Sequence, residues 1–94
     1  MSGNITAAIG RLDSICNLLH QMVAIARKEN WPEDLANAAQ KLAKDVTDRT
    51  GAVDSADTNL VDLHNLVAEV STSMSNDFAA FGRALALDLV NSAN

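Results

Sequence analysis

The chain is predicted to be an all-α protein that assembles into an oligomeric helical bundle. Its 94 residues are 48% hydrophobic, but only three are aromatic, and the apolar volume comes mostly from Ala, Leu, Val and Ile. Ala and Leu are strong helix formers, strand-forming aromatic residues are scarce, and the chain has a single Pro. A chain of this length forms one domain at most, which we expect to span residues 1–94.

The clearest periodic stretch runs from Leu60 to Leu89. Its apolar residues recur at steps of three and four, which is the spacing of one continuous helix face. At 1.5 Å per residue, such a helix is on the order of 45 Å long, which is more than the rest of the chain can cover. The stretch therefore indicates assembly with a second chain.

Residues 5–28 are expected to form the first helix. Asn4 is a suitable N-cap, and the apolar face that begins at Ile5 is broad enough to contact two neighbouring helices. Arg27 and Lys28 fall in the last turn, where their positive charge opposes the negative end of the helix dipole.

A break follows at residues 29–34, and residues 32–50 are expected to form the second helix. Pro32 cannot lie inside a helix but fits the first turn of one. Asn30 and Glu33 have the spacing of a capping box. Because the connection is short, the two helices are predicted to form an antiparallel hairpin. On the outer face of the second helix, spacing pairs Lys41 with Asp45, Lys44 with Asp48, and Asp45 with Arg49.

Residues 50–57 allow two interpretations. In the first, Gly51 ends the second helix in a left-handed cap, and Asp54 or Ser55 caps the third helix. In the second, the helix continues, because apolar residues recur every seven positions from Val46 to Met74 and a Gly inside a helix costs only about 1 kcal/mol. We favour the break, which places a long C-terminal helix at about residues 56–90.

That C-terminal helix carries the predicted interface. Residues 71–77 are poor helix formers, so one alternative is a kink near residues 73–77 or a second helix start with Ser75 as its cap. A straight helix would instead overhang the hairpin after Met74. Exposed apolar surface of this kind marks an interface, and a symmetric pair is the commonest assembly. We therefore predict a homodimer joined through residues 74–90, with the interface residues Met74, Phe78, Phe81, Leu85 and Leu89.

The charge of the chain is unevenly distributed. Twelve acidic and seven basic residues give a net charge of -5, and the whole excess lies in residues 50–94, where Arg83 is the only base. An acidic surface repels phosphates, which disfavours binding to nucleic acids and to anionic membranes. No stretch is apolar enough to span a membrane and no signal peptide precedes the first helix, so we expect a cytoplasmic protein.

The sequence contains no catalytic or metal-binding pattern. His20 and His64 have no partner ligand at helical spacing, and neither is followed by the Lys and Gly of a phosphotransfer histidine. Cys16 cannot form an intramolecular disulfide, and its apolar neighbours indicate a buried side chain. No Ser stands in a Gly-flanked elbow, and no Gly-rich loop could hold a phosphate. We therefore expect a protein that is not an enzyme and has neither a cofactor nor a metal.

Trp31 is the most informative single residue. It is expected to pack on Leu35 or Ala36 as a hydrophobic staple, and its alternative role is to anchor a protein partner. A helical hairpin of this length with a Trp in its turn resembles the small WXG-type proteins of bacterial specialised secretion. The signature Gly two residues after the Trp is Glu33 here, and the chain lacks the Tyr of the secretion signal, so we do not assign it to that family.

Together these features predict a non-enzymatic protein–protein interaction module. Such an adaptor, chaperone or inhibitor would act as a homo-oligomer and bind an unidentified protein partner. The main alternative is an oligomer that binds a small anionic ligand in a pocket between protomers, with Arg11, Arg27 and Lys28 as contacts. A third alternative is mimicry of a nucleic acid by the acidic half, although its carboxylates are sparse on any one face.

Overall fold

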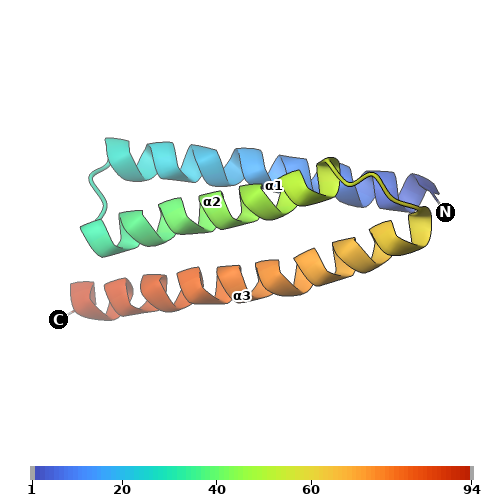
Figure 1. Cartoon of the computed structure of the whole chain (residues 1–94). Coiled ribbons are helices and arrows are strands. Elements are labelled where there is room, and N and C mark those ends of the chain that lie inside the picture. The colour runs from blue at the N-terminus through green and yellow to red at the C-terminus, as the bar shows by residue number, and fades with distance from the viewer. Residues whose placement is uncertain (1, 94) are drawn as a thin grey trace.

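In the computed structural model, which describes the backbone of residues 2–93 and the side chains of residues 5–92, the chain forms three helices. They are α1 (Ser2–Lys28), α2 (Glu33–Asp54) and α3 (Leu60–Ala93), and no strand forms within the described residues (Figure 1). The prediction of an all-α helical bundle is confirmed. The expected cap, Asn4, lies inside α1, which already begins at Ser2.

The middle helix, α2, lies between the other two and is antiparallel to both (Figure 1). α1 and α3 therefore run in the same direction, but their backbones scarcely approach each other, whereas α2 packs along both. The molecule is elongated, with principal extents of 52 × 22 × 17 Å and a radius of gyration of 15.4 Å. A compact chain of this length has a radius of gyration of about 12 Å, so a large part of each helix stays at the surface.

The turn between α1 and α2 is built by Asn30. This residue has a left-handed backbone with a φ of 54°, and the amide of Trp31 donates to the carbonyl oxygen of Ala26 at 3.0 Å. The pattern is a Schellman motif, in which the left-handed residue closes the C-terminus of a helix. Asn30 thus ends α1 instead of starting α2, whose N-cap is Pro32 without a side-chain hydrogen bond. The predicted capping box with Glu33 is wrong, whereas the antiparallel hairpin is confirmed.

α2 and α3 are separate helices, but the break between them lies beyond Gly51. Gly51 is helical, and α2 continues to Asp54, after which the Ser55 amide donates to the Gly51 carbonyl oxygen at 3.0 Å. α3 follows Asn59, whose Oδ1 caps it by accepting the Asp62 amide at 2.9 Å. The left-handed cap at Gly51, the capping of the third helix by Asp54 or Ser55, and the continuous helix are therefore all wrong.

Burial of Val53 explains why α2 passes Gly51. The Val53 side chain is only 2% exposed and belongs to the hydrophobic core. Full burial of a Val is worth about 1.5–3 kcal/mol, which exceeds the cost of about 1 kcal/mol for a Gly in a helix interior. Tertiary packing thus overrides the local preference of the sequence.

α3 is a single helix through residues 73–77, without a second helix start, and Figure 1 shows no sharp kink there. Its C-terminal end lies beside the hairpin, because Ala84 and Leu87 line a small cavity together with Pro32 and Leu35 at the start of α2. The expected overhang after residue 74 is therefore wrong. Antiparallel packing brings the end of α3 back along the whole length of α2.

The core lies along the centre of the molecule, where all three helices contribute. Val46 of α2 is fully buried within it. Cys16 of α1 is also buried, as its apolar neighbours predict. The buried members of this cluster are Leu12, Cys16, Leu19, Leu42, Ala43, Val46, Val53, Val70 and Met74.

Candidate interaction surface

An open trough runs between α1 and α3, where their backbones scarcely approach each other. A cavity of about 370 Å³ lies within it, and most of the side chains that line this cavity are apolar. The buried core residues Leu12 and Met74 reach this lining, so the trough opens directly onto the core. The lining residues are Ala8, Arg11, Leu12 and Ile15 of α1, and Val67, Ser71, Met74, Ser75 and Phe78 of α3.

The α1 wall of the trough carries a coiled-coil-like seam. Ile15, Leu18, Met22 and Ile25 follow one another at steps of three, four and three, which places them on one stripe of the helix. Ile15 and Met22 are half-buried against the core. Leu18 and Ile25 project outward, with exposed fractions of 62% and 46%. The seam therefore offers two apolar side chains that the described residues leave largely uncovered.

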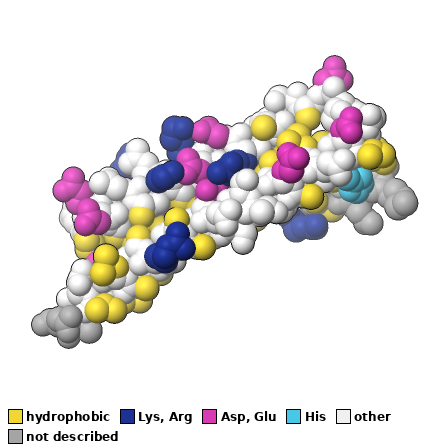
Figure 2. Space-filling model, turned by 60° about the horizontal axis from the view of Figure 1, so that its bottom comes forward, with side chains coloured by type: hydrophobic (Ala, Val, Ile, Leu, Met, Phe, Trp, Pro, Cys, Tyr) yellow, Lys and Arg dark blue, Asp and Glu magenta, His cyan; other side chains and the backbone are white. Residues whose placement is uncertain are grey.

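On the α3 wall, Phe78 lines the cavity, and Leu85 and Leu89 follow it at steps of seven and four, on the same stripe of the helix. These three side chains are 40%, 37% and 61% exposed. Because α1 and α3 are parallel and Ile15 and Phe78 line the same cavity, the exposed residues of both walls gather toward the C-terminal end of α3. Figure 2 shows exposed apolar side chains at that end of the molecule. At about 200 Å² for each large side chain, the exposed residues of the two walls present on the order of 500 Å² of apolar surface, as much as the largest patch on a typical monomer.

Three of the predicted interface residues, Phe78, Leu85 and Leu89, are exposed, and two are not. Met74 is 6% exposed and belongs to the core, and Phe81 is half-buried and packs against that core. The pitch of the helix explains the difference, because residues on neighbouring stripes of α3 face the core and the open trough in turn. Met74 and Phe81 therefore hold the monomer together, and a charge at either position would disturb the fold itself.

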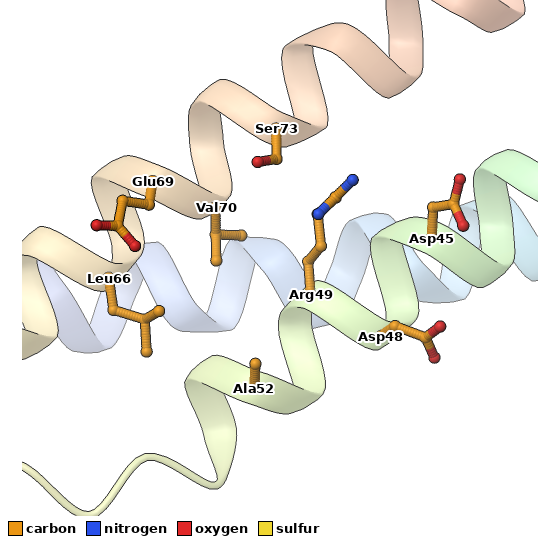
Figure 3. Close-up of a pocket in the computed structure, with 8 residues that line it drawn as sticks. All are labelled: Asp45, Asp48, Arg49, Ala52, Leu66, Glu69, Val70 and Ser73. Carbon is orange, nitrogen blue, oxygen red and sulfur yellow. The ribbon is translucent and has the colours of Figure 1, made fainter.

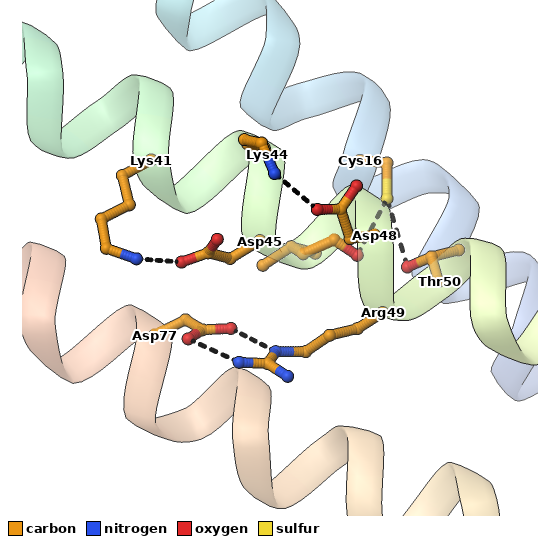
Figure 4. A network of polar contacts seen from close by, with 9 residues as sticks. Cys16, Lys41, Lys44, Asp45, Asp48, Arg49, Thr50 and Asp77 are labelled. Carbon is orange, nitrogen blue, oxygen red and sulfur yellow. Dashed lines mark hydrogen bonds and ion pairs between the residues drawn. The ribbon is translucent and has the colours of Figure 1, made fainter.

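Behind the trough, an ion pair joins α2 to α3. Arg49 donates through Nε to Asp77 Oδ2 at 2.7 Å and through Nη2 to Oδ1 at 3.2 Å (Figure 4). The hydrogen bond to Asp77, together with its charge, raises the pKa of Arg49. The Asp77 side chain is only 12% exposed, so this bidentate contact fixes the register of α2 against α3. The predicted pair between Arg49 and Asp45 is wrong, because Arg49 crosses to α3 instead.

The other charged pairs of α2 stay on its surface. Lys41 contacts Asp45 at 2.6 Å and Lys44 contacts Asp48 at 2.8 Å, as their spacing predicts (Figure 4). Both carboxylates and Glu69 of α3 line a groove of about 390 Å³ between the two helices (Figure 3). Two of these three carboxylates are thus already paired with lysines. Among the described residues, no group of His, Cys, Asp or Glu side chains could hold a metal ion.

Cys16 joins α1 to α2 through a polar contact inside the core. Its Sγ donates to Thr50 Oγ1 at 3.3 Å, and Thr50 is only 4% exposed (Figure 4). The thiol therefore gives the buried Thr50 hydroxyl a hydrogen-bond partner inside the core. This role fits the prediction of a buried structural cysteine.

The predicted anion contacts do not converge on one pocket. Arg11 lines the trough between α1 and α3, whereas Arg27 lines a different groove between α1 and α2. Lys28 is exposed in the last turn of α1 and lines neither. The α1–α2 groove has a volume of about 480 Å³ and combines Arg27 with His20 and Lys44, the last of which is paired with Asp48 in the same lining. Sequence spacing did not reveal this second cluster, because two of its members come from α1 and the third from α2.

Trp31 lies in the turn between α1 and α2 and is half-buried. Its backbone amide closes the last turn of α1. The backbone of Trp31 therefore helps to form the hairpin turn, whereas both roles expected of its side chain, the staple on Leu35 or Ala36 and the partner anchor, stay predictions.

Leu18 and Ile25 are the trough residues that sequence reasoning did not assign to an interface. They appear in the sequence only as a widening of the apolar face of the first helix. The sequence feature that could have identified them is the three-four repeat that they share with Ile15 and Met22. This repeat runs beside the stripe of the same helix that is buried in the core. That repeat could have identified α1 as a second wall.

Comparisons of the chain with known protein families, with curated proteins and with solved structures found no match. Within the part of the chain that the structure describes, no helix is long and apolar enough to cross a lipid bilayer. The geometry of the trough is therefore the basis for the functional proposal.

Proposed function

We propose that the protein is a non-enzymatic protein–protein interaction module that associates with a second copy of itself through the α1–α3 trough. The observation that carries this proposal is the exposed apolar surface on both walls of the trough, formed by Leu18, Ile25, Phe78, Leu85 and Leu89. Covering apolar surface is favourable by roughly 25 cal/mol per Å². A partner that fills the trough therefore removes a large unfavourable contact with water.

The contacts between the helices support a helical partner. In a four-helix bundle, neighbouring helices pack along their length, whereas helices on the diagonal scarcely touch. α1 and α3 have the relation of diagonal helices, because α2 packs along both while they hardly approach each other. A helix in the trough would take the fourth position of such a bundle and cover both walls.

The size of the surface supports a second copy as the partner. The apolar part amounts to roughly 500 Å² for each protomer, and with its polar rim it approaches the roughly 800 Å² that each partner buries in a typical stable interface. Two identical chains can bury the same surface on both sides. For this reason two-fold homodimers are the commonest closed assembly.

Leu89 and Leu87 provide a matched pair for the test. They are 61% and 62% exposed on the same helix, but Leu87 lines the cavity at the start of α2, whereas Leu89 lies eleven residues after Phe78, on the stripe of α3 that faces the trough. In size-exclusion chromatography with light scattering, we expect the wild type at micromolar concentration to have twice the 10.0 kDa mass of the chain. Leu89→Asp should be monomeric with unchanged helical content by circular dichroism, while Leu87→Asp should remain dimeric.

Two outcomes would contradict the proposal. One is a wild-type protein that stays monomeric at tens of micromolar, where interfaces of this size are normally occupied. The other is a Leu87→Asp variant that dissociates as readily as Leu89→Asp, because the trough would then not be the surface that matters.

A second candidate function is the binding of a small anion in the α1–α2 groove. Arg27 favours this candidate, because it forms no ion pair with any described residue. Val23 and Ala43 supply apolar lining beside it, and His20 Nε2 lies 3.0 Å from Thr47 Oγ1 in the same groove. A guanidinium next to hydrogen-bonding groups suits a phosphate or a carboxylate.

Thermal denaturation with inorganic phosphate or citrate tests this second candidate. Either anion should raise the Tm of the wild type by a few degrees if it binds the folded protein. The shift should shrink in Arg27→Gln but persist in Lys28→Gln, whose side chain lies outside the groove. An equal shift in both variants would indicate only the general stabilisation that such salts give, and would exclude the site.

A further inference from the structure

We propose that the second copy enters the trough with its own α1, antiparallel to the α1 of the first copy, and that Arg11 of each copy pairs with Glu29 of the other. This inference rests on the proposed self-association and specifies its geometry. In such a dimer, each α1 forms one wall of its own trough and also occupies the trough of the other copy.

The seam on α1 is bounded by one opposite charge at each end. Arg11 lies four residues before Ile15, and Glu29 lies four residues after Ile25, so both continue the three-four repeat of the seam. The amide of Glu29 still donates to the Ile25 carbonyl oxygen at 2.9 Å, which extends the helical geometry to this residue. Both side chains are on exposed residues. The seam therefore consists of an apolar centre between a cation and an anion.

Among the residues whose side chains the structure describes, neither charge forms an ion pair. In the part of the chain that the structure describes, ion pairs join Lys41 to Asp45, Lys44 to Asp48 and Arg49 to Asp77, and none includes Arg11 or Glu29. An acidic residue at the C-terminal end of a helix is also unfavourable with respect to the helix dipole. A cation from a second chain would offset this cost for Glu29.

An antiparallel register satisfies every position of the seam at once. When Leu18 faces Met22 of the second copy, Ile15 faces Ile25 of the second copy, and Arg11 faces Glu29 of the second copy. The two-fold axis generates each of these pairs twice. A parallel arrangement would instead place Arg11 against Arg11 and Glu29 against Glu29, which would repel at both ends of the seam. Charge complementarity therefore selects the antiparallel orientation.

The α3 wall fits the same arrangement. α1 and α3 run in the same direction, so a helix that is antiparallel to α1 is also antiparallel to α3. This orientation gives the alternating directions of an up-down four-helix bundle. The exposed side chains of Phe78, Leu85 and Leu89 would then pack against the inserted helix. A helix from an unrelated protein could fill the trough in the same way, and the experiment below separates the two occupants.

Charge reversal at the two ends of the seam tests the inference. Arg11→Glu places two acids opposite each other at both ends of the dimer, and Glu29→Arg places two bases there, so each variant should weaken the dimer Kd by about tenfold. The double variant Arg11→Glu/Glu29→Arg exchanges the charges and should return the Kd to within about threefold of the wild type. Sedimentation equilibrium over a concentration series measures the Kd values.

Lys28→Glu is the matched control, because it changes the net charge as Arg11→Glu does at an exposed position outside the seam. It should leave the Kd within about twofold of the wild type. A wild type that is monomeric at every concentration overturns the proposed self-association and leaves the trough to a different protein. A dimeric wild type whose double variant is not restored overturns the antiparallel α1 pairing, while self-association stands.

Discussion

At the scale of single residues, two carboxyl groups of like charge lie close together in the fold. Asp54 is the last residue of α2, and the Asp13 carboxyl of α1 lies beside it. The pKa of Asp54 is raised, first because the carboxyl is partly removed from water. The hydrogen bond with the Asp13 carboxyl and the negative charge of Asp13 raise it further. The ionised form of Asp54 is therefore disfavoured in the folded state, and its position at the C-terminal end of a helix adds an unfavourable dipole interaction.

We expect Asp54→Asn to raise the Tm at pH 7. The sign follows from linkage: a carboxyl whose pKa is higher in the folded state than in the unfolded state destabilises the fold once it is ionised. As the pH falls toward the raised pKa, the wild-type Asp54 becomes protonated and the advantage of the variant should shrink. Thermal unfolding by circular dichroism at several pH values between 7 and 4 measures this.

Asp57→Asn is the control for Asp54→Asn, because it removes one negative charge from the exposed connector between α2 and α3. The difference in Tm between variant and wild type at each pH cancels the effect of other groups that titrate in both proteins. One of these groups is Asp45, whose pKa is lowered by its hydrogen bond with Lys41. That pair stabilises the fold at neutral pH and is lost as the pH falls, so it acts in the opposite sense. An advantage of Asp54→Asn that grows on acidification would refute the assignment.

At the scale of helices, Gly51 shows how packing extends an element beyond a residue that weakens it. Gly51 lies within α2, no described Gly has a positive φ, and a Cβ built on Gly51 meets nothing within 4 Å. A Gly at such a position costs conformational entropy without any steric benefit. The position is therefore open to a better helix former.

Gly51→Ala should stabilise the protein by about 0.5–1 kcal/mol, which corresponds to roughly 3–6 °C in Tm for a domain of this size. Denaturant unfolding followed at 222 nm measures the gain. Asn30→Ala provides the contrast, because a φ of 54° is unfavourable for Ala by about 1–2 kcal/mol. If Gly51→Ala lowered the stability, the last turn of α2 would not be helical in solution.

At the scale of the whole molecule, the arrangement of the helices leaves one side of the bundle open. α2 packs along both of its neighbours, and α1 and α3 remain apart. The radius of gyration of 15.4 Å, compared with about 12 Å for a compact chain of this length, also indicates an extended shape. Such a shape leaves apolar side chains at the surface, and their coverage by a second copy should contribute to stability.

The thermal stability of the wild type should therefore depend on protein concentration. If only folded chains associate, a higher protein concentration favours the folded dimer by mass action. The Tm should then rise by several degrees over a hundredfold increase in concentration. Leu89→Asp should have a Tm that does not change over the same range. A wild-type Tm that is independent of concentration would contradict coupling between folding and assembly.

Much of the architecture could be predicted from the sequence, because helix formation leaves local signals. The three-four periodicity from Leu60 to Leu89 predicted α3, and Pro32 marked the boundary between α1 and α2. The end of α2 could not be predicted from Gly51. The position of that boundary depends on the burial of Val53, which exists only once α2 packs against its neighbours.

The candidate site could be predicted only in part. Periodicity identified Phe78, Leu85 and Leu89 as apolar surface, but it also included Met74 and Phe81, which pack into the core. It did not assign Leu18 and Ile25 to an interface. A helix with a broad apolar face can serve two neighbours, and spacing along the chain cannot tell which stripe faces which neighbour.

Local spacing and composition alone thus fix the helical nature of the chain, the hairpin turn and the excess of acid in its second half. Tertiary structure decides where α2 ends, that Arg49 crosses to Asp77, and which apolar stripes remain uncovered between α1 and α3. The physical reason is that secondary structure follows interactions within a few residues, whereas exposure depends on where helices distant in the sequence pack. The open trough arises from that packing, and so do the proposals for what fills it.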